Sequence, residues 1–298
     1  MITSKRQRIL IVSDAKNEAD DQYAIVHALL TPRFRVVGMV ASHFSGAKTN
    51  LLSYNEMIKL ANLTRTIGMY PIKIGAEGSM KEEQLNHSEG SDLIVQEALK
   101  ADADPLYIVC IGALTDVGTA ITINPEIVDR FTLIWVGGGR YPTGSHEANL
   151  NHDILAANRL FSSKVNLWQI PSEAYKTMLV SVTELQLKLS TVNELGNYLY
   201  EQLIQFATDN VNEKNWINTE CWVMGDSAAI GVLLDEQKGN YKLIAPPHFA
   251  SNCQHMTSDD NNRPIRVYQS LNVRMILEDF FAKVSLFEMA AKGVKQSD

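Results

Sequence analysis

The chain has 298 residues, of which 45% are hydrophobic and 20% are charged, a balance typical of a globular protein with a large core. Its formal net charge of −7 argues against a nucleic-acid partner, because binding to phosphates requires clustered basic residues. No apolar run approaches the length of a membrane span, and the three widely spaced cysteines predict neither a disulfide framework nor a zinc motif. A cytoplasmic protein without a membrane or nucleic-acid partner is therefore expected.

Strand-type and helix-type segments alternate along the first two thirds of the chain. The expected strands are residues 9–13, 35–41, 71–74, 106–111 and 131–136. The expected helices are residues 20–30, 49–61 and 154–161, with a further helix that includes 93–99. The runs at 106–111 and 131–136 are continuously apolar, which is typical of parallel strands buried on both faces.

The last third of the chain is expected to be more helical. Helices are predicted over residues 182–189, 193–208, 226–234 and 270–292, interrupted by strands near 241–245 and 265–268. No internal repeat, low-complexity tract or long linker divides the chain. We therefore predict a single α/β domain over residues 1–298, with a mostly parallel central sheet flanked by helices in a Rossmann-like arrangement.

The most informative stretch is the acidic segment between the first strand and the first helix. It places Asp14, Glu18, Asp20 and Asp21 close together in the sequence. Crowded carboxylates repel one another, and a hard cation such as Ca²⁺, which takes about six to eight oxygen ligands, turns that repulsion into attraction. The alternative is a set of solvated acidic residues that complement the dipole of the following helix. A metal site explains the whole cluster better than that alternative does.

Glycine turns follow two of the predicted strands. Gly112 follows the strand at 106–111, and Gly137-Gly138-Gly139 follows the strand at 131–136. The ligands of open α/β sheets bind in a crevice at the carboxyl ends of the strands. Because Asp14 follows a strand in the same way, we expect the acidic segment to lie at this crevice.

These motifs, together with Asp226 near the end of the chain, resemble those of the inosine–uridine-preferring nucleoside hydrolase family. The matching segments occur in the family's order and are the acidic loop 14–21, the Gly112-Ala113-Leu114-Thr115 turn, the glycine run 137–139, Glu147-Ala148-Asn149, Asp153-Ile154-Leu155-Ala156-Ala157 and Gly225-Asp226. The resemblance extends from about residue 8 to about residue 283. It implies a nucleoside hydrolase fold, a bound Ca²⁺, and a homodimer or homotetramer.

The resemblance implies that the Ca²⁺ site joins segments that are far apart in the sequence. Asp21 and Asp226 are each expected at the start of a helix on the crevice rim, where they would bind the cation with the backbone carbonyl of Ile111. A plain helix N-cap is the alternative for Asp226. Asp14, at the end of its strand, is the expected third carboxylate.

The acidic loop departs from the family pattern, because it is two residues longer between Asp14 and the Asp20-Asp21 pair. Asn17 or Glu18 is therefore an alternative third metal ligand. Asn17 is also a candidate for binding the substrate.

By the same resemblance, Asp20 is the expected general base. A cation lowers the pKa of bound water, and a neighbouring carboxylate can accept the proton as water attacks the anomeric carbon. Anionic surroundings would also stabilise an oxocarbenium-like transition state. The alternative for Asp20 is a solvated acidic residue in the first helical turn.

Four further residues are candidates for contacting the substrate. The resemblance implies that Glu147 and Asn149 hydrogen-bond the sugar hydroxyls, with loop polarity as the alternative. Trp222 and Trp216 precede Asp226, and an indole presents a large apolar face on which a base or a sugar could stack. Core packing is the alternative for both. Asp153 is expected to cap the helix at 154–161.

The largest departure from the family is Gly225, which stands where relatives carry a histidine beside the metal-binding aspartate. A histidine elsewhere could replace it as the acid that protonates the leaving group. The candidates lie in loop-like stretches and are His43, His146, His152 and His255. For each of them, the alternative is a surface residue. His27 falls in a predicted helix and is expected to be structural or on the surface.

We therefore predict Ca²⁺-dependent hydrolysis of the N-glycosidic bond of ribonucleosides to base and ribose. A hydrolase that acts on a different ribosyl or other glycoside is an alternative, because of Gly225 and the short segment between Gly139 and Glu147. A non-catalytic relative that binds Ca²⁺ and a ribose-like ligand is a third possibility. Asp20 favours an enzyme, because a metal site alone would not require it.

Overall fold

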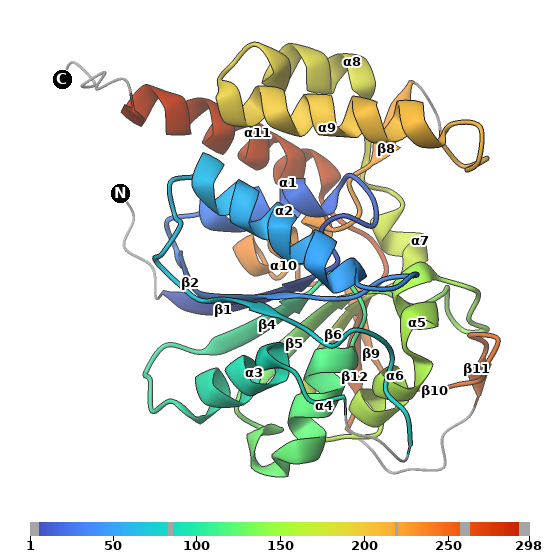
Figure 1. Ribbon diagram of the computed structural model, residues 1–298. Coiled ribbons are helices and arrows are strands. Elements are labelled where there is room, and N and C mark those ends of the chain that lie inside the picture. The colour runs from blue at the N-terminus through green and yellow to red at the C-terminus, as the bar shows by residue number, and fades with distance from the viewer. Residues whose placement is uncertain (1–5, 83–85, 218–219, 257–262, 292–298) are drawn as a thin grey trace.

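An eight-stranded sheet runs through the centre of the computed structural model, which describes residues 6–82, 86–217, 220–256 and 263–291 (Figure 1). The strand order is β3-β2-β1-β4-β5-β6-β12-β9. The strands are β1 (Gln7–Ser13), β2 (Phe34–Ala41), β3 (Ile72–Ile74), β4 (Leu106–Cys110), β5 (Phe131–Val136), β6 (Asn166–Ile170), β9 (Tyr241–Ile244) and β12 (Ile265–Tyr268). Neighbouring strands are parallel except β12 and β9, which confirms the predicted mostly parallel sheet.

Helices cover both faces of the sheet (Figure 1). One side carries α1 (Asp21–Leu29), α2 (Thr49–Leu63), α9 (Glu194–Asn210), α10 (Ser227–Leu234) and α11 (Val273–Ala291). The other side carries α3 (Glu89–Leu99), α4 (Thr115–Ile123) and α6 (Ile154–Phe161). Each layer has its own apolar core: along β4, Val109 belongs to the first core and Ile108 to the second. The apolar run predicted at 106–111 is continuous because helices cover this strand on both faces of the sheet.

Several elements were not anticipated from the sequence. They are β6, α4, α5 (Ala148–His152), α7 (Ser172–Tyr175), the antiparallel pair β7 (Leu179–Ser181) and β8 (Cys221–Val223), and the pair β10 (His248–Phe249) and β11 (His255–Met256). The helix predicted over 182–189 is α8 (Val182–Leu185) followed by a π-helical turn at Gln186–Ser190. Residue 292, the predicted end of the last helix, lies outside the described residues. None of the described helices has the length and apolarity to cross a membrane.

Helix α1 connects the carboxyl edge of the sheet to the C-terminal helix. Its first residue, Asp21, is the last residue of the acidic loop, and His27 lies in its last turn. His27 is fully buried, as expected for a structural residue, and its Nε2 lies 2.7 Å from Oδ2 of Asp279 on α11. The two ends of α1 therefore contact two separate parts of the chain.

Candidate functional site

The carboxyl ends of three adjacent strands border a cleft of about 680 Å³. Asp14 follows β1, Ile111 follows β4, and the segment with Glu147 follows β5. The cleft is lined by every residue predicted from the sequence to bind metal or substrate or to act as base: Asp14, Asn17, Glu18, Asp20, Asp21, Ile111, Glu147, Asn149, Trp216, Trp222 and Asp226. A second cleft of about 660 Å³, lined by residues such as Gln7 and Trp168, contains none of them.

Three carboxylates converge in this cleft from two distant segments. Each of Asp20, Asp21 and Asp226 offers an oxygen that lies within 4.8 Å of the others. Asp20 is the N-cap residue of α1 and Asp226 that of α10, yet within the described structure neither side chain makes a capping hydrogen bond to its own helix. Instead, the backbone N–H of Asp226 donates to Oδ2 of Asp20 at 3.1 Å. The plain N-cap interpretation therefore does not account for these side chains.

Burial makes this cluster electrostatically unfavourable. The exposed fractions of Asp20, Asp21 and Asp226 are 8%, 2% and 7%. Burial, followed by repulsion from the neighbouring carboxylates, raises the pKa values of Asp21 and Asp226 well above 3.8. Burial also raises the pKa of Asp20 to about 6, although backbone hydrogen bonds oppose this rise. A hard cation coordinated by these oxygens would offset the repulsion, so the donor set fits Ca²⁺.

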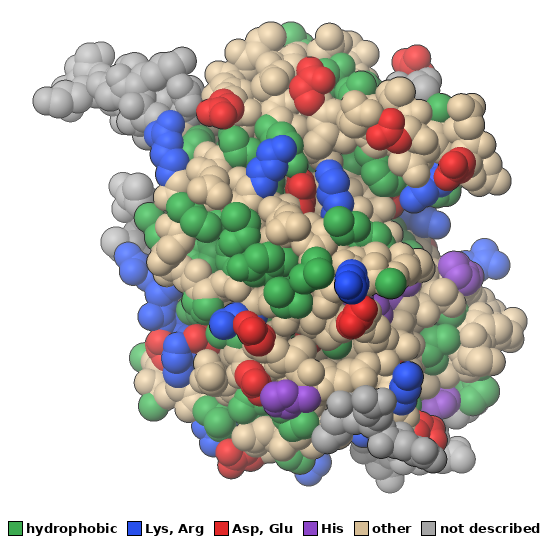
Figure 2. Space-filling model, viewed as in Figure 1, with side chains coloured by type: hydrophobic (Ala, Val, Ile, Leu, Met, Phe, Trp, Pro, Cys, Tyr) green, Lys and Arg blue, Asp and Glu red, His purple; other side chains and the backbone are tan. Residues whose placement is uncertain are grey.

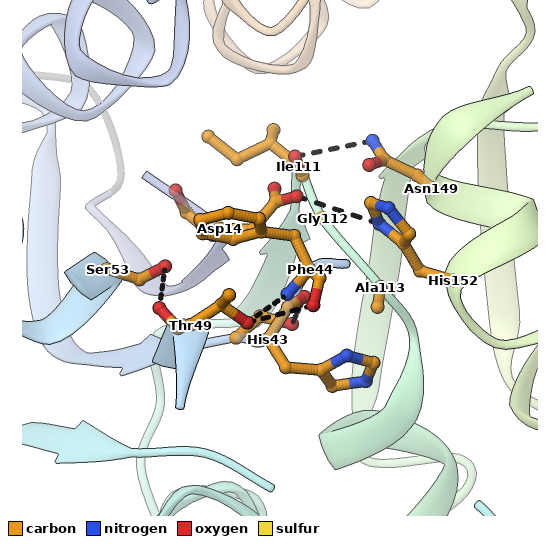
Figure 3. Close-up of polar contacts among 12 residues, drawn as sticks. Asp14, His43, Phe44, Thr49, Ser53, Ile111, Gly112, Ala113, Asn149 and His152 are labelled. Carbon is orange, nitrogen blue, oxygen red and sulfur yellow. Dashed lines mark hydrogen bonds and ion pairs between the residues drawn. The ribbon is translucent and has the colours of Figure 1, made fainter. Parts of the chain in front are cut away.

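Asp14 lines the same cleft as this trio. Figure 3 shows the different surroundings of its carboxylate, near Gly112 and His152. Asp14 is 1% exposed, and its Oδ2 has no hydrogen-bond partner in the described structure. Burial raises the pKa of Asp14 to about 8. Gly112 allows the turn after β4 to approach closely, because a Cβ at this position would lie 2.6 Å from Oδ1 of Asp14. The oxygen Oδ2 therefore remains available to a ligand or a proton.

Nδ1 of His152 lies 3.8 Å from Oδ2 of Asp14 (Figure 3). Burial, with a further contribution from nearby His43 and His146, lowers the pKa of His152 to about 4. The imidazole is therefore neutral near pH 7, and the contact is not an ion pair.

Comparison with known proteins agrees with this geometry. The model of the family described as inosine-uridine preferring nucleoside hydrolase matches residues 10–279. The chain belongs to this family. A non-specific ribonucleoside hydrolase, RihC, from Klebsiella pneumoniae is 23% identical over 227 residues, which are 69% of this chain and 74% of the relative. Membership in the nucleoside hydrolase family supports hydrolysis of ribonucleosides as the general activity.

Solved structures share the fold at low sequence identity. A purine-preferring ribonucleoside hydrolase from Gardnerella vaginalis superposes with a TM-score of 0.79 at 16% identity, over 94% of this chain and 99% of its own. The type III effector protein XopQ, solved with adenosine diphosphate ribose, gives a TM-score of 0.74 at 11% identity, over 96% and 95% of the two chains. These similarities confirm the predicted nucleoside hydrolase fold.

The two residues predicted to bind the sugar also organise the backbone. Glu147 is the N-cap residue of α5, where its carboxylate accepts hydrogen bonds from the backbone N–H groups of Asn149, Leu150 and Gly138. Asn149 donates from Nδ2 to the carbonyl of Val136 at 2.9 Å and to that of Ile111 at 3.3 Å (Figure 3). Both side chains are therefore held in fixed positions at the cleft.

The two tryptophans differ in exposure. Trp222 is 3% exposed and packs edge-on against Trp216 at 5.7 Å between ring centroids. Trp216 lines the same cleft and is 50% exposed. Trp222 is thus mainly a packing residue, whereas the indole of Trp216 is available at the cleft rim.

Of the four loop histidines, His146 is the one that lines the cleft in the described structure. Nε2 of His43 lies 2.8 Å from the hydroxyl oxygen of Thr115. His152 belongs to α5, and His255 packs against Tyr141 at 4.5 Å. Asp153 caps α6, as predicted, by accepting a hydrogen bond from the backbone N–H of Ala156.

Sequence reasoning missed Tyr175, the last residue of α7. Tyr175 lines the cleft, and its hydroxyl donates to Oε1 of Glu147 at 3.1 Å. The helix α7 has only four residues and follows a strand that was not predicted. No signal in the sequence connected Tyr175 with the acidic loop.

Proposed function

We propose that this chain hydrolyses the N-glycosidic bond of ribonucleosides, releasing base and ribose, with one Ca²⁺ bound in the cleft. The observation that carries this proposal is the buried cluster of Asp20, Asp21 and Asp226 in a cleft of about 680 Å³. The relatives described as non-specific and as purine-preferring ribonucleoside hydrolases support a purine or pyrimidine nucleoside as the substrate.

The proposed cation would be held by Asp21, Asp226 and the backbone carbonyl of Ile111, completed by Asp14 or Asp20. Bound there, Ca²⁺ would make the attacking water more acidic and offset the charge of the buried carboxylates. The carboxylates also favour the reaction directly, because the sugar develops positive charge in an oxocarbenium-like transition state. Glu147 and Asn149, which their backbone contacts hold in position, would bind the sugar hydroxyls.

Two assignments of the general base follow from the four carboxylates. In the first, Asp20 accepts the proton from water and Asp14 completes the metal site. In the second, Asp20 completes the metal site with Asp21 and Asp226, and Asp14 accepts the proton. The 4.8 Å grouping of the trio and the unpartnered Oδ2 of Asp14 support the second assignment.

The rim of the cleft offers an apolar surface for a base. Trp216 and Leu179 line it with exposed fractions of 50% and 52%. The combination of buried carboxylates at the floor and exposed apolar side chains at the rim suits a ligand with a polar sugar and a flat aromatic base. Asn17, which also lines the cleft, is a further candidate for contacting the sugar.

We also propose that the protein forms a homodimer or homotetramer. Hydrophobic side chains gather on the surface over α2 and the segment that follows it (Figure 2). They include Leu52, Ile67 and Met69, with exposed fractions of 50%, 46% and 72%. An apolar patch of this kind is typical of an interface between protein surfaces.

A substrate screen tests the proposed function. Protein stripped of metal with a chelator is incubated with purine and pyrimidine ribonucleosides and with other glycosides, with and without added Ca²⁺, and reducing sugar is measured. We expect ribose release from ribonucleosides only when Ca²⁺ is present. Release of reducing sugar from a different glycoside would favour a hydrolase that acts on another ribosyl or other glycoside. Ca²⁺ and nucleoside binding without any release would identify a non-catalytic binding protein.

A further inference from the structure

The ring of Tyr175 lies against the backbone of Gly225, beside Asp226. A Cβ built on Gly225 would lie 2.8 Å from Cδ2 of Tyr175 and 3.4 Å from Cε2 of the same ring. A side chain at position 225 therefore requires the ring to move. The ring thus takes up space into which a histidine at position 225 would extend.

Tyr175 is held in this position from both ends. Its backbone N–H donates to the carbonyl of Pro171 at 3.1 Å, within the turn that begins α7. Its hydroxyl donates to Oε1 of Glu147, whose other oxygen accepts the N–H of Gly138 at 2.7 Å. Burial, followed by the charge of Glu147, raises the pKa of the Tyr175 phenol above its usual value. Because the hydroxyl proton is directed at Glu147, it is not directed at a leaving group.

Among the described residues that line the cleft, His146 and Lys176 also carry a nitrogen group that could donate a proton. Both residues are exposed at the rim. The side of the cleft next to Asp226 instead presents an aromatic ring and carboxylates. On this side of the cleft, the described residues therefore provide no nitrogen group that could protonate a neutral base leaving as an anion.

A base that already carries a positive charge needs no such acid. Water adds its oxygen to the anomeric carbon, and the bond from that carbon to the ring nitrogen breaks. The electron pair of the broken bond returns to the ring, which leaves as a neutral base, and the proton from water passes to the carboxylate base. The products are ribose, the neutral base and one proton, so atoms and charge balance.

The cleft also suits the charge of such a substrate. With one Ca²⁺ bound, the four ionised carboxylates of Asp14, Asp20, Asp21 and Asp226 would leave a net charge of −2 in the cleft. These residues are at most 8% exposed, so water screens that charge weakly, whereas Lys176 is exposed. The face of an aromatic ring attracts cations, and Tyr175 and Trp216 both line the cleft.

We propose that this site prefers ribosides whose base is cationic in the ring that holds the glycosidic nitrogen, and that Tyr175 determines this preference by excluding an acid at position 225. This inference rests on the proposed function and specifies its substrate class. Tyr175 affects selectivity because its ring fills the space beside Gly225 and because Glu147 accepts the proton of its hydroxyl in a hydrogen bond.

The test compares 7-methylguanosine, which is cationic, with guanosine, which differs by one methyl group and that charge. General acid catalysis contributes about 10²–10⁴-fold in rate, so we expect kcat/KM for 7-methylguanosine to exceed that for guanosine by at least about 100-fold. Nicotinamide riboside and uridine form a second pair, for which the same direction is expected. Equal rates within each pair would overturn the proposal.

Variants separate the role of Tyr175 from the intrinsic lability of the cationic substrates. The double variant Tyr175→Ala/Gly225→His makes room for an imidazole, so its 7-methylguanosine-to-guanosine ratio should fall by at least about tenfold through faster guanosine cleavage. Tyr175→Leu/Gly225→His provides a second version that retains more of the buried volume. Ca²⁺ binding and thermal unfolding identify which variants are folded. A ratio that stays high in both folded variants overturns the assignment of Tyr175.

Two single variants serve as controls. Tyr175→Phe keeps the ring and removes the hydroxyl, so KM should rise for both substrates while their ratio stays constant. His146→Ala should also leave the ratio unchanged; a rise in the ratio would identify His146 as an acid for guanosine and overturn the proposal. Cleavage of neither substrate by the parent protein would reject the proposed function itself, whereas equal cleavage of both rejects only the present inference.

Discussion

At the scale of single residues, the roles of the carboxylates follow from their contacts rather than from their order in the sequence. Asp21 receives a hydrogen bond from the hydroxyl of Ser13 at 2.6 Å, and Asp20 accepts one from the backbone of Asp226. Oδ2 of Asp14 has no such partner among the described residues. These differences allow metal binding and proton transfer to be tested separately.

The variant Asp21→Ala should lose Ca²⁺ binding, because it removes one of three converging carboxylates. Calorimetric titration of chelator-stripped protein measures this directly, with the exposed Asp129→Ala as the matched control. The thermal midpoint of Asp21→Ala in saturating Ca²⁺ should also be lower than that of the control, since a cation that binds only the folded state stabilises it. Unchanged titration curves would rule out Asp21 as a ligand.

The pair Asp14→Asn and Asp20→Asn should identify the base. Asparagine keeps the shape of the side chain but cannot accept the proton, so the variant at the base should retain Ca²⁺ affinity and lose about 10²–10⁴-fold in rate. The variant at the metal ligand should lose Ca²⁺ affinity as well as rate. A residue whose variant retains more than about a tenth of the parent rate is not the base.

At the scale of helices and strands, what could be predicted depended on length and on local pattern. The strands β1, β2, β4 and β5 were predicted because apolar residues run continuously through them. β6 reads Asn-Leu-Trp-Gln-Ile, and its polar Gln169 is fully buried because Nε2 donates to the carbonyl of Gly137. That contact comes from a turn about thirty residues away, so no local pattern reveals it.

The same limit applies to the site. The residues of the acidic loop and Asp226 could be found from charge density and resemblance, because these signals are local in sequence. The grouping of Asp20, Asp21 and Asp226 within 4.8 Å could not be predicted from the sequence, because it depends on how α1 and α10 meet. Tyr175 was missed because its importance lies in two contacts, with Gly225 and with Glu147, that only the folded chain creates.

The N-terminus of α5 should depend on the charge of Glu147. This carboxylate accepts three backbone N–H groups and the Tyr175 hydroxyl, and hydrogen bonds to charged groups contribute about 1.5–3 kcal/mol each. Glu147→Gln should therefore lower the free energy of unfolding by about 1–3 kcal/mol and raise KM. Chemical denaturation and steady-state kinetics measure the two effects. Tyr175→Phe removes only one of these contacts, so it should lower the free energy of unfolding less than Glu147→Gln does. A larger effect of Tyr175→Phe would contradict the role of Glu147 at the N-terminus of α5.

At the scale of the whole molecule, stability without metal should depend on pH in an unusual direction. The raised pKa values mean that the folded chain binds more protons than the unfolded chain above the ordinary value of 3.8. Such groups stabilise the fold below that value, and their contribution is lost as the pH rises through about 6 for Asp20 and about 8 for Asp14.

The thermal midpoint of chelator-treated protein is therefore expected to fall as the pH is raised from about 5 to about 8.5. Added Ca²⁺ should stabilise the protein more strongly at the upper end of this range, because its ligands must be ionised. Differential scanning calorimetry across the range, with and without Ca²⁺, measures both trends. A stabilisation by Ca²⁺ that is independent of pH would contradict the assignment of these buried carboxylates as its ligands.

The position of α1 has a consequence for the far side of the molecule. One end of this helix presents Asp21 to the cleft, and the other end places His27 against Asp279 of α11. A cation that restrains the first end also restrains the surface on which the C-terminal helix packs, and energetic coupling between two sites is reciprocal. Backbone amides of α11 should therefore exchange with deuterated solvent more slowly when Ca²⁺ is present. His27→Ala should reduce that protection while leaving the carboxylates of the cleft in place.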